Sequence, residues 1–224
     1  MERSVRFAPG ARGRLTEHDL GRFSGATLFD RVARALCAAR CLPRKELYEA
    51  WEVARRARRL FKGGRVVDLA AGHGLLAHLM LLLDDSSTDA VAVDAHRPSS
   101  AEKIHEALVA VWPHLSAKVR WATVSLETFE LASTDVVVSS HACGGLTDRI
   151  LDRAAAVRAR VAVLPCCHAL AREGDPLSGW LDGPMAMDVR RAVALEAAGY
   201  RVWTQTIPAA ITPKNRLLLA APAD

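Results

Sequence analysis

The spacing of apolar residues along the chain changes character near residue 65. Before that point, residues 24–41 and 42–64 carry apolar side chains at helical spacing, and Gly63-Gly64 ends the second segment. These patterns predict a helical segment over residues 25–62. Residues 1–24 are rich in Gly and Arg without a period, which predicts a loose lead-in. The apolar positions of the first helical pattern are Leu28, Val32, Ala35, Leu36 and Ala39.

From residue 65 onwards, short β-branched runs alternate with amphipathic segments. This alternation predicts parallel βαβ units with right-handed crossovers. The last two predicted strands have no helix between them, so they are expected to form an antiparallel hairpin. The expected strands are 65–70, 89–94, 118–124, 134–140, 160–165, 201–207 and 216–222, and the expected helices are 74–83, 99–112, 145–157 and 186–198.

These elements predict an α/β protein with two parts. Residues 65–224 are expected to form a Rossmann-like sheet of about seven strands, mostly parallel with an antiparallel terminal hairpin. Residues 1–64 are expected to form a basic helical appendage. Half of the 224 residues are hydrophobic, so a sizeable core can form.

Composition also bears on the setting in which the protein works. No apolar run is long enough for a membrane span, and the N-terminus has no apolar signal region. The five cysteines are an odd number and two of them are adjacent, which does not indicate a disulfide framework. We therefore expect a reducing, cytoplasmic environment.

Charge is unevenly distributed along the chain. Residues 1–65 contain 16 Lys and Arg against 7 Asp and Glu, whereas the rest contains 14 against 18. Such a basic face fits RNA or another polyanion, although a solvated helix face has the same composition. The residues expected to project from one helix face are Arg55, Arg56, Arg59 and Lys62.

The segment VVDLAAGHGLLAHLM (66–80) has the pattern of a strand, a small-residue turn and a helix. Gly72 and Gly74 permit positive φ angles and a close approach of the backbone to a ligand. Asp94 ends the next strand, where a carboxylate can accept hydrogen bonds from ribose hydroxyls. Asp68 would repel a pyrophosphate but could face a cationic amino group, and the turn lacks the G-x-G-x-x-G pattern of dinucleotide sites.

This turn and the terminal hairpin together resemble class I S-adenosylmethionine-dependent methyltransferases over about residues 65–222. The resemblance implies S-adenosylmethionine as the cofactor, with its methionine part at the turn and its adenine near the end of the third strand. Ala70 stands where that family usually has its first glycine. The cofactor contacts implied in this way are Asp68, Ala70, Gly72, Gly74, Asp94, Ala95, Ser125, Leu126, Ser139 and His141.

Two clusters of Cys and His follow apolar runs, in SSHACGGLTD (139–148) and LPCCH (164–168). Because the carboxyl ends of parallel strands meet at one edge of a sheet, both clusters are expected near the transferred methyl group. Their members are His141, Cys143, Cys166, Cys167 and His168.

Three interpretations of these clusters stay open. The first is a zinc site, for which the cysteines and histidines are suitable ligands; however, their spacing is not that of a C-x₂-C knuckle and adjacent cysteines seldom bind one ion together, so no metal is predicted. A cysteine nucleophile would resemble RNA cytosine carbon-5 methyltransferases, although Ser-His-Ala-Cys replaces their Asp-x-Pro-Cys. The third interpretation is a pocket in which a histidine or aspartate orients or deprotonates an acceptor beside buried cysteines. The predicted catalytic residues are His141 or His168, then Asp148, with Cys143 as a pocket neighbour.

The two clusters also resemble a narrower group, over about residues 135–168. Cys-Gly-x-x-Thr-Asp followed by Cys-Cys-His is similar to the tRNA 2′-O-methyltransferases of the acceptor stem (tRNA methyltransferase 13 type) and the methyltransferase-like protein 25 type. The chain differs from the acceptor-stem enzymes in having no upstream Cys/His finger and in having Ser140 where they tend to have lysine. The resemblance implies methyl transfer, with RNA (tRNA ribose or base) as the expected acceptor. A protein or small-molecule acceptor, or a non-catalytic binding module, is the alternative.

Overall fold

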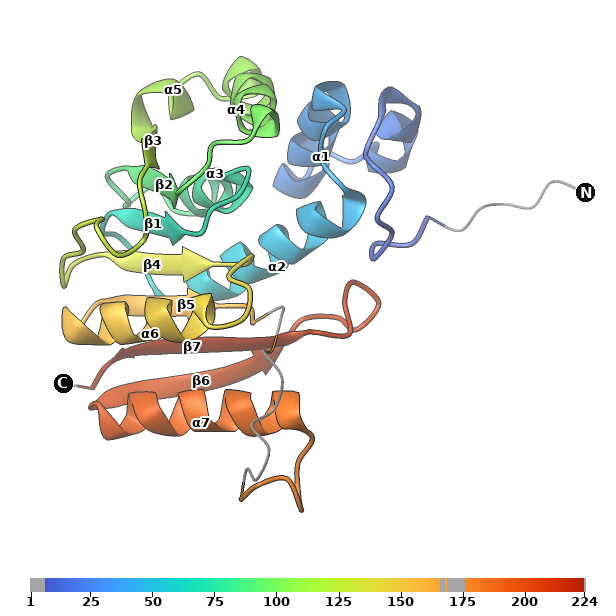
Figure 1. The fold of residues 1–224 in the computed structure, drawn as a ribbon. Coiled ribbons are helices and arrows are strands. Elements are labelled where there is room, and N and C mark those ends of the chain that lie inside the picture. Colours follow the sequence, from blue (N-terminus) through green and yellow to red (C-terminus); the bar gives the residue numbers. More distant parts are fainter. Residues whose placement is uncertain (1–6, 166–167, 169–175, 224) are drawn as a thin grey trace, which may run out of the picture.

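A computed structural model describes residues 7–165, 168 and 176–223 of the chain. Its centre is one seven-stranded sheet, and the predicted α/β fold with its antiparallel terminal hairpin is confirmed (Figure 1). Each strand begins within two residues of its predicted start. The strands are β1 (Val66–Leu69), β2 (Ala90–Asp94), β3 (Val119–Thr123), β4 (Val136–Ser139), β5 (Arg160–Val163), β6 (Tyr200–Thr206) and β7 (Arg216–Pro222).

The strand order is β3-β2-β1-β4-β5-β7-β6, so β3 and β6 form the two edges. Strands β1 to β5 are parallel, and β7 runs antiparallel to both β5 and β6. The chain leaves β1 towards β2 on one side and later returns to β4 on the other. Open α/β sheets bind ligands at such a reversal, outside the carboxyl ends of the strands.

Helices cover both faces of the sheet, because successive side chains of a strand point to opposite faces. Val66, Val136 and Val138 point into one core with the helices α1 (Leu28–Ala39), α2 (Arg44–Leu60), α3 (Leu75–Leu82), α4 (Ser99–Val111) and the short α5 (Leu115–Lys118). Val67 and Val137 point into the other core, which α6 (Leu146–Ala156) and α7 (Gly183–Ala197) cover.

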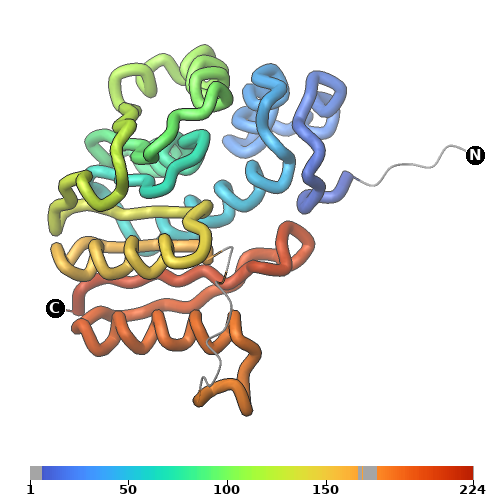
Figure 2. Tube along the Cα trace, in the orientation of Figure 1, coloured from blue at the N-terminus to red at the C-terminus, as the bar shows by residue number. Residues whose placement is uncertain are grey.

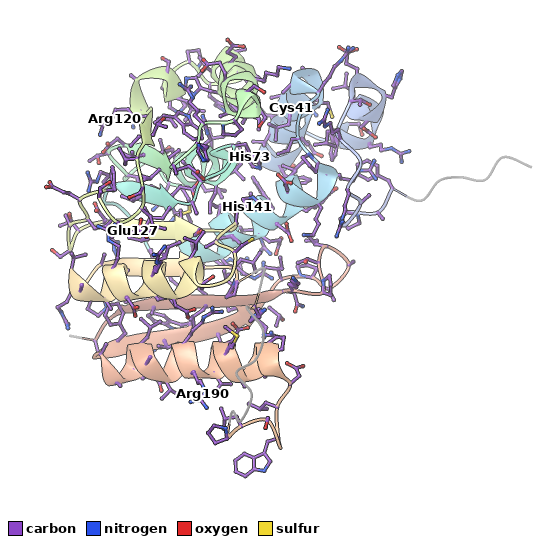
Figure 3. All side chains as sticks on the ribbon, viewed as in Figure 1. Cys41, His73, Arg120, Glu127, His141 and Arg190 are labelled. Atoms are coloured by element: carbon purple, nitrogen blue, oxygen red, sulfur yellow. The ribbon has the colours of Figure 1, made fainter. Side chains whose placement is uncertain are left out.

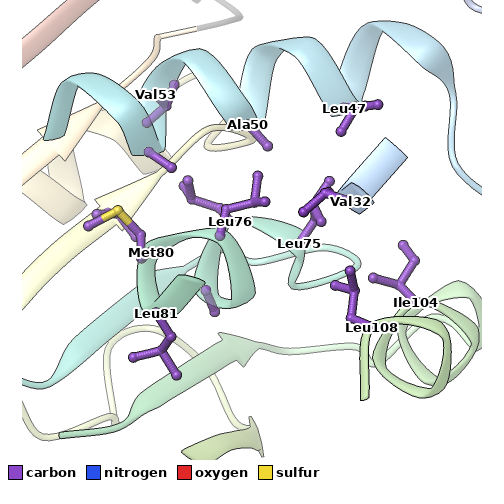
Figure 4. Packing of buried hydrophobic residues seen from close by; sticks show 14 of the residues in the cluster. Val32, Leu47, Ala50, Val53, Leu75, Leu76, Met80, Leu81, Ile104 and Leu108 are labelled. Atoms are coloured by element: carbon purple, nitrogen blue, oxygen red, sulfur yellow. The ribbon is translucent and has the colours of Figure 1, made fainter. Parts of the chain in front are cut away.

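The N-terminal helices share the core of the sheet. Leu47, Ala50 and Val53 of α2 lie over Leu75 and Leu76 of α3 in one buried cluster (Figure 4). The trace in Figure 2 shows the same neighbours, with the blue helices beside the green ones and the red β6–β7 pair at the far edge of the sheet. This packing fixes the start of α2 relative to the turn that follows β1.

The predicted loose lead-in over residues 1–24 is wrong for the part that the structure describes. A 3-10 helix, η1 (Glu17–Phe23), begins with a capping box between Thr16 and Asp19. Leu15 and Phe23 are buried in the core beside α1. The segment is ordered because these two apolar side chains anchor it, although their spacing follows no helical period.

Candidate active site

The turn between β1 and α3 has the left-handed backbone that its glycines permit. The φ angles of Gly72 and Gly74 are 55° and 72°, and Ala70 adopts a φ of 55° without being glycine. A Cβ at position 74 would lie 2.5 Å from the Trp121 ring, so packing excludes a side chain there. A Cβ at position 72 would meet nothing nearer than the His141 ring at 3.9 Å. The turn is therefore open on the side that faces His141.

Two carboxylates flank this turn. Asp68 is buried at the end of β1 and accepts a hydrogen bond from the Ala77 backbone N–H at 3.3 Å. Burial, with a smaller contribution from nearby Asp94, raises the pKa of Asp68 to about 8. Without a ligand this carboxyl keeps its proton at neutral pH. A cationic group placed beside it would favour the ionised form.

Asp94 holds the turn and the end of β2 together. Its two carboxylate oxygens accept the backbone N–H groups of Gly72 at 2.9 Å and His96 at 3.0 Å. Each oxygen retains a lone pair for a further donor such as a ribose hydroxyl. Its predicted neighbours Ala95 and Ser125 are exposed, and Leu126 is buried beyond β3. These cofactor contacts stay predictions.

Two buried polar atoms at the end of β4 have no hydrogen-bond partner within the described part of the chain. They are the Ser139 hydroxyl oxygen and Nε2 of His141, two residues apart. Leaving such a group unpaired costs about 1–3 kcal/mol, so they are candidate contacts for a ligand. With the open turn at Gly72 and the buried Asp68, they form a donor and acceptor set that fits the methionine end of S-adenosylmethionine and an acceptor beside it.

A third residue joins His73 and His141 from outside the predicted site. Glu46, in the first turn of α2, lies with its carboxylate oxygen 2.7 Å from His73 Nε2. The rings of His73 and His141 meet edge to face, with centroids 5.4 Å apart. Figure 3 labels both residues, which lie close together. Sequence reasoning did not find Glu46, because no local pattern links it to a turn 27 residues later.

Glu46, His73 and His141 each have one potential metal-ligating atom, and these atoms lie within 4.8 Å of one another. In the described part of the chain, this is the set that comes nearest to a metal site. However, the Leu75 backbone N–H donates to His73 Nδ1 at 3.3 Å. In a neutral ring the proton of His73 then sits on Nε2, the atom that faces Glu46. A metal ion would have to displace that proton, so we assign no metal here.

The other predicted catalytic residues belong to a different network. Both oxygens of Asp188 on α7 lie 3.0 Å from His168 Nε2. Asp148 accepts two hydrogen bonds from Arg191, at 2.7 and 3.0 Å, and Arg191 also reaches Asp188. Arg216 donates to Asp188 at 2.6 Å. His168 and Asp148 are therefore linked through Arg191 and Asp188, and no contact among these joins them to His141.

The structure places one of the three clustered cysteines. Cys143 is exposed on the loop after β4. Cys166 and Cys167 lie outside the described residues. The predicted convergence of both Cys/His clusters on the methyl group stays a prediction.

A cavity of about 750 Å³ opens near the ends of β6 and β7, beside α7. Much of its lining is apolar, and the charged side chains that reach it are Arg56, Arg59, Arg216 and Asp188. A partly apolar, anionic molecule would match this lining. The apolar residues are Pro165, Met185, Val189, Ala192, Val193, Leu217 and Leu218.

The four basic residues predicted to face a polyanion differ in their surroundings. Arg55 and Arg56 both pair with Glu52, and Arg56 also donates to the Thr206 carbonyl. Arg59 and Lys62 are exposed at the end of α2. The positive charge open to a partner is therefore concentrated at Arg59 and Lys62.

Comparison with known proteins agrees with this architecture. A methyltransferase domain family matches residues 45–174, more than half of the chain, so the chain belongs to that methyltransferase family. The match begins in α2 and includes Glu46, the Gly turn and the β4 loop. S-adenosylmethionine is the cofactor that this membership implies.

Solved structures show the same fold at low identity. An O-methyltransferase family protein from Burkholderia thailandensis is 17% identical with a TM-score of 0.55, and the alignment covers 92% of this chain and 63% of that protein. The M1A22 tRNA methyltransferase TrmK of B. subtilis is 15% identical with a TM-score of 0.51, covering 77% and 66%. The S-adenosylmethionine-dependent methyltransferase SibL is 17% identical with a TM-score of 0.53, covering 95% and 67%. The chain thus spans less than two thirds of the first protein's length.

No curated protein sequence matches the chain. No helix among the described residues is both long and apolar enough to cross a membrane.

Proposed function

We propose that the chain transfers the methyl group of S-adenosylmethionine to an O–H or N–H acceptor held at the end of β4, with His141 as the general base. One observation carries this proposal: at the β1–β4 reversal, an open glycine turn and a buried carboxyl lie beside two buried polar atoms that have no partner among the described residues. Burial, followed by the neighbouring His73, lowers the pKa of His141 to about 4, so this ring is neutral at neutral pH and has a lone pair available to an acceptor proton.

The cofactor contacts follow the same geometry. Asp68 would receive the amino group of the methionine part, and Asp94 the ribose hydroxyls. The acceptor atom then attacks the methyl carbon, the carbon–sulfur bond breaks with its electron pair left on sulfur, and the acceptor proton passes to His141. Positioning the two reactants and removing this proton are the main contributions required of the protein.

We propose RNA as the acceptor. The exposed Arg59 lies on the helix that also carries Glu46 into the site, and the exposed Lys62 follows two residues after the end of that helix. The Cys-Gly-x-x-Thr-Asp and Cys-Cys-His elements support a likeness to the tRNA methyltransferase 13 and methyltransferase-like protein 25 types. The fold is also that of a tRNA methyltransferase. We also propose a cytoplasmic location, because an odd number of cysteines does not indicate a disulfide framework.

A small-molecule acceptor is the second candidate, and the cavity beside α7 is the observation that favours it. Its apolar lining and its arginines suit an amphipathic anion of small size. Strand β6 runs parallel to β4, because β7 is antiparallel to both β5 and β6. The cavity near the end of β6 therefore lies at the side of the sheet where β4 also ends.

The test is methyl transfer from tritium-labelled S-adenosylmethionine to total RNA, soluble protein and a small-molecule extract. We expect label in RNA, with mass spectrometry identifying the methylated nucleoside. The Asp94→Ala variant is the control and should lose the label, because it removes the proposed ribose contact. Label in another fraction would replace RNA as the acceptor, and label in none, with no binding of S-adenosylmethionine, would contradict methyl transfer.

A further inference from the structure

We propose that Glu46 and His73 are positioning residues, which keep a negative charge beside His141 and so stabilise the imidazolium that forms when His141 takes the acceptor proton. This inference rests on the proposed function. It assigns a catalytic contribution to α2. This helix lies outside the carboxyl ends of the strands, where the contacts to the cofactor are expected. Three separate elements supply the groups: α2, the turn after β1 and the loop after β4.

The first step is the location of one proton. The amide N–H of Leu75 points at His73 Nδ1 from 3.3 Å, so that nitrogen presents its lone pair. A neutral His73 therefore carries its proton on Nε2 and donates it to Glu46 across 2.7 Å. The backbone of α3 thus sets the tautomer of His73, and the tautomer makes His73 a donor to a carboxylate.

The second step is the charge of Glu46. Burial alone would raise the pKa of Glu46, but the hydrogen bond from His73 and the positive groups around it lower the pKa below its usual value. Glu46 is then an anion, held in place by His73, at neutral pH. The charge is partly shielded from water, which makes its effect on neighbours larger than on the surface.

The third step is the response of His141 to this charge. Its Nε2 is buried and lacks a partner within the described residues, so the ring is free to take a proton from a ligand. Among the groups whose charge acts on His141, a protonated His73 opposes its protonated form most, Glu46 and Asp94 favour that form, and Lys45 opposes it. In the neutral tautomer that donates to Glu46, His73 carries no charge of its own. Lys45 is itself paired with Glu49 at 2.8 Å. Glu46 is the anion nearest in the cluster, so its loss should make His141 a weaker base.

Glu46→Gln is the appropriate change, because Gln keeps a side-chain oxygen for His73 and removes only the charge. Glu52→Gln is the matched control: it also removes a partly buried carboxylate from α2, but one that pairs with Arg55 and Arg56. Both variants should bind S-adenosylmethionine like the wild type, as measured by calorimetry. This binding shows that the fold and the cofactor site are intact.

The kinetic measurement uses total RNA as acceptor, or whichever extract takes up the label in the experiment above. We expect Glu46→Gln to lower kcat at least about 10-fold at pH 7, with an unchanged KM for S-adenosylmethionine. The wild-type kcat should be flat from pH 6 to 9, because His141 is already neutral. The kcat of Glu46→Gln should rise with pH over that range, because hydroxide from the solvent would then remove the acceptor proton in place of His141. A wild-type rate and a flat profile in Glu46→Gln would overturn the proposal.

A second measurement keeps the network testable even if no extract takes up label. Nitrogen-15 spectra of the histidine-labelled full chain report which ring nitrogen bears the proton. We expect the Nε2–H tautomer of His73 in the wild type and in Glu46→Gln. A proton on Nδ1 would contradict the network, whether or not methyl transfer occurs. Titration with Zn²⁺ tests whether the three residues bind a metal ion instead. We expect no specific binding. Micromolar binding that is abolished by each of the variants Glu46→Gln, His73→Ala and His141→Ala would also overturn the proposal.

Discussion

Gly72 and Gly74 sit two residues apart with similar φ angles, yet an alanine at each should have a different consequence. At position 74 the new Cβ would lie 2.5 Å from Trp121 and 3.3 Å from the Ala92 side chain. Overpacking of this kind costs about 1–3 kcal/mol. The left-handed backbone adds about 1–2 kcal/mol, and reduced freedom of the unfolded chain returns about 0.4–1 kcal/mol. We therefore expect Gly74→Ala to lower the free energy of unfolding by about 2–4 kcal/mol.

At position 72 the packing cost is missing, because the nearest atom to the new Cβ is in His141 at 3.9 Å. The backbone costs alone predict a loss of about 0.5–1 kcal/mol. The native Ala70, at a φ of 55°, shows that alanine is compatible with this turn. However, the Cβ at 72 would enter the space that we assign to S-adenosylmethionine. Gly72→Ala should therefore fold and bind the cofactor at least about 10-fold more weakly, a change of about 1.4 kcal/mol.

Thermal unfolding and calorimetry separate these two effects. For a chain of this length, 1 kcal/mol corresponds to about 2–4 °C in Tm, so Gly74→Ala should lose roughly 5–15 °C and Gly72→Ala only a few degrees. In Gly74→Ala, the further change Trp121→Leu should recover part of the loss, because it removes the ring that the Cβ meets. A folded Gly72→Ala that binds S-adenosylmethionine like the wild type would refute the placement of the cofactor. A wild-type Tm in Gly74→Ala would refute the packing argument.

Three further predictions test the charges. Because the folded pKa of Asp68 is about 8 and its unfolded pKa about 3.9, its contribution to stability is complete below pH 4 and is lost as the pH rises towards 8; chemical denaturation of the ligand-free protein should show this slope, and Asp68→Asn should lack it. Reversing Arg59 and Lys62 to Glu should weaken RNA binding in a filter assay and reduce its dependence on log salt by about 1 per lost phosphate contact, whereas unchanged binding would indicate a solvated surface. Arg58→Met should cost about 3–5 kcal/mol in denaturant unfolding, because it leaves Asp84 without its buried partner at 3.0 Å, and a loss below 1 kcal/mol would show that water replaces the pair.

The strands and most helices could be predicted because their signals are local. Runs such as VVD (66–68) and VVV (136–138) are β-branched and end at polar residues, so their positions follow from a few neighbouring residues. Gly72 and Gly74 are likewise recognisable because a turn between a strand and a helix limits what can occupy it. The segment η1 was missed because Leu15 and Phe23 are anchored by distant partners and follow no period.

The site was harder to predict because its contacts join distant residues. Glu46 reaches His73 because α2 packs across α3, and nothing in the sequence around Glu46 encodes that crossing. The basic run of α2 looks uniform in sequence, but the helix turns Arg58 into the core and leaves Arg59 exposed. The sequence groups His168 and Asp148 with His141 because their strands are neighbours. In the structure His168 instead contacts Asp188 directly, and Arg191 joins Asp148 to the same aspartate.

Helix α2 also offers a way to discriminate between acceptors. Its first turn carries Glu46 into the site, and Arg59 lies 13 residues later, about 20 Å along the helix axis. The buried face of α2 holds this spacing fixed, because Leu47, Ala50 and Val53 are packed against the main domain. A small molecule held only at the β4 end could not reach Arg59, whereas an RNA strand spans such a distance over several nucleotides. A small molecule in the cavity beside α7 would also touch Arg59, but Lys62 does not line that cavity. Charge reversal at Lys62 should therefore raise KM without changing kcat if the acceptor is RNA, and should change neither if the acceptor is a small molecule at the β4 end or in the cavity.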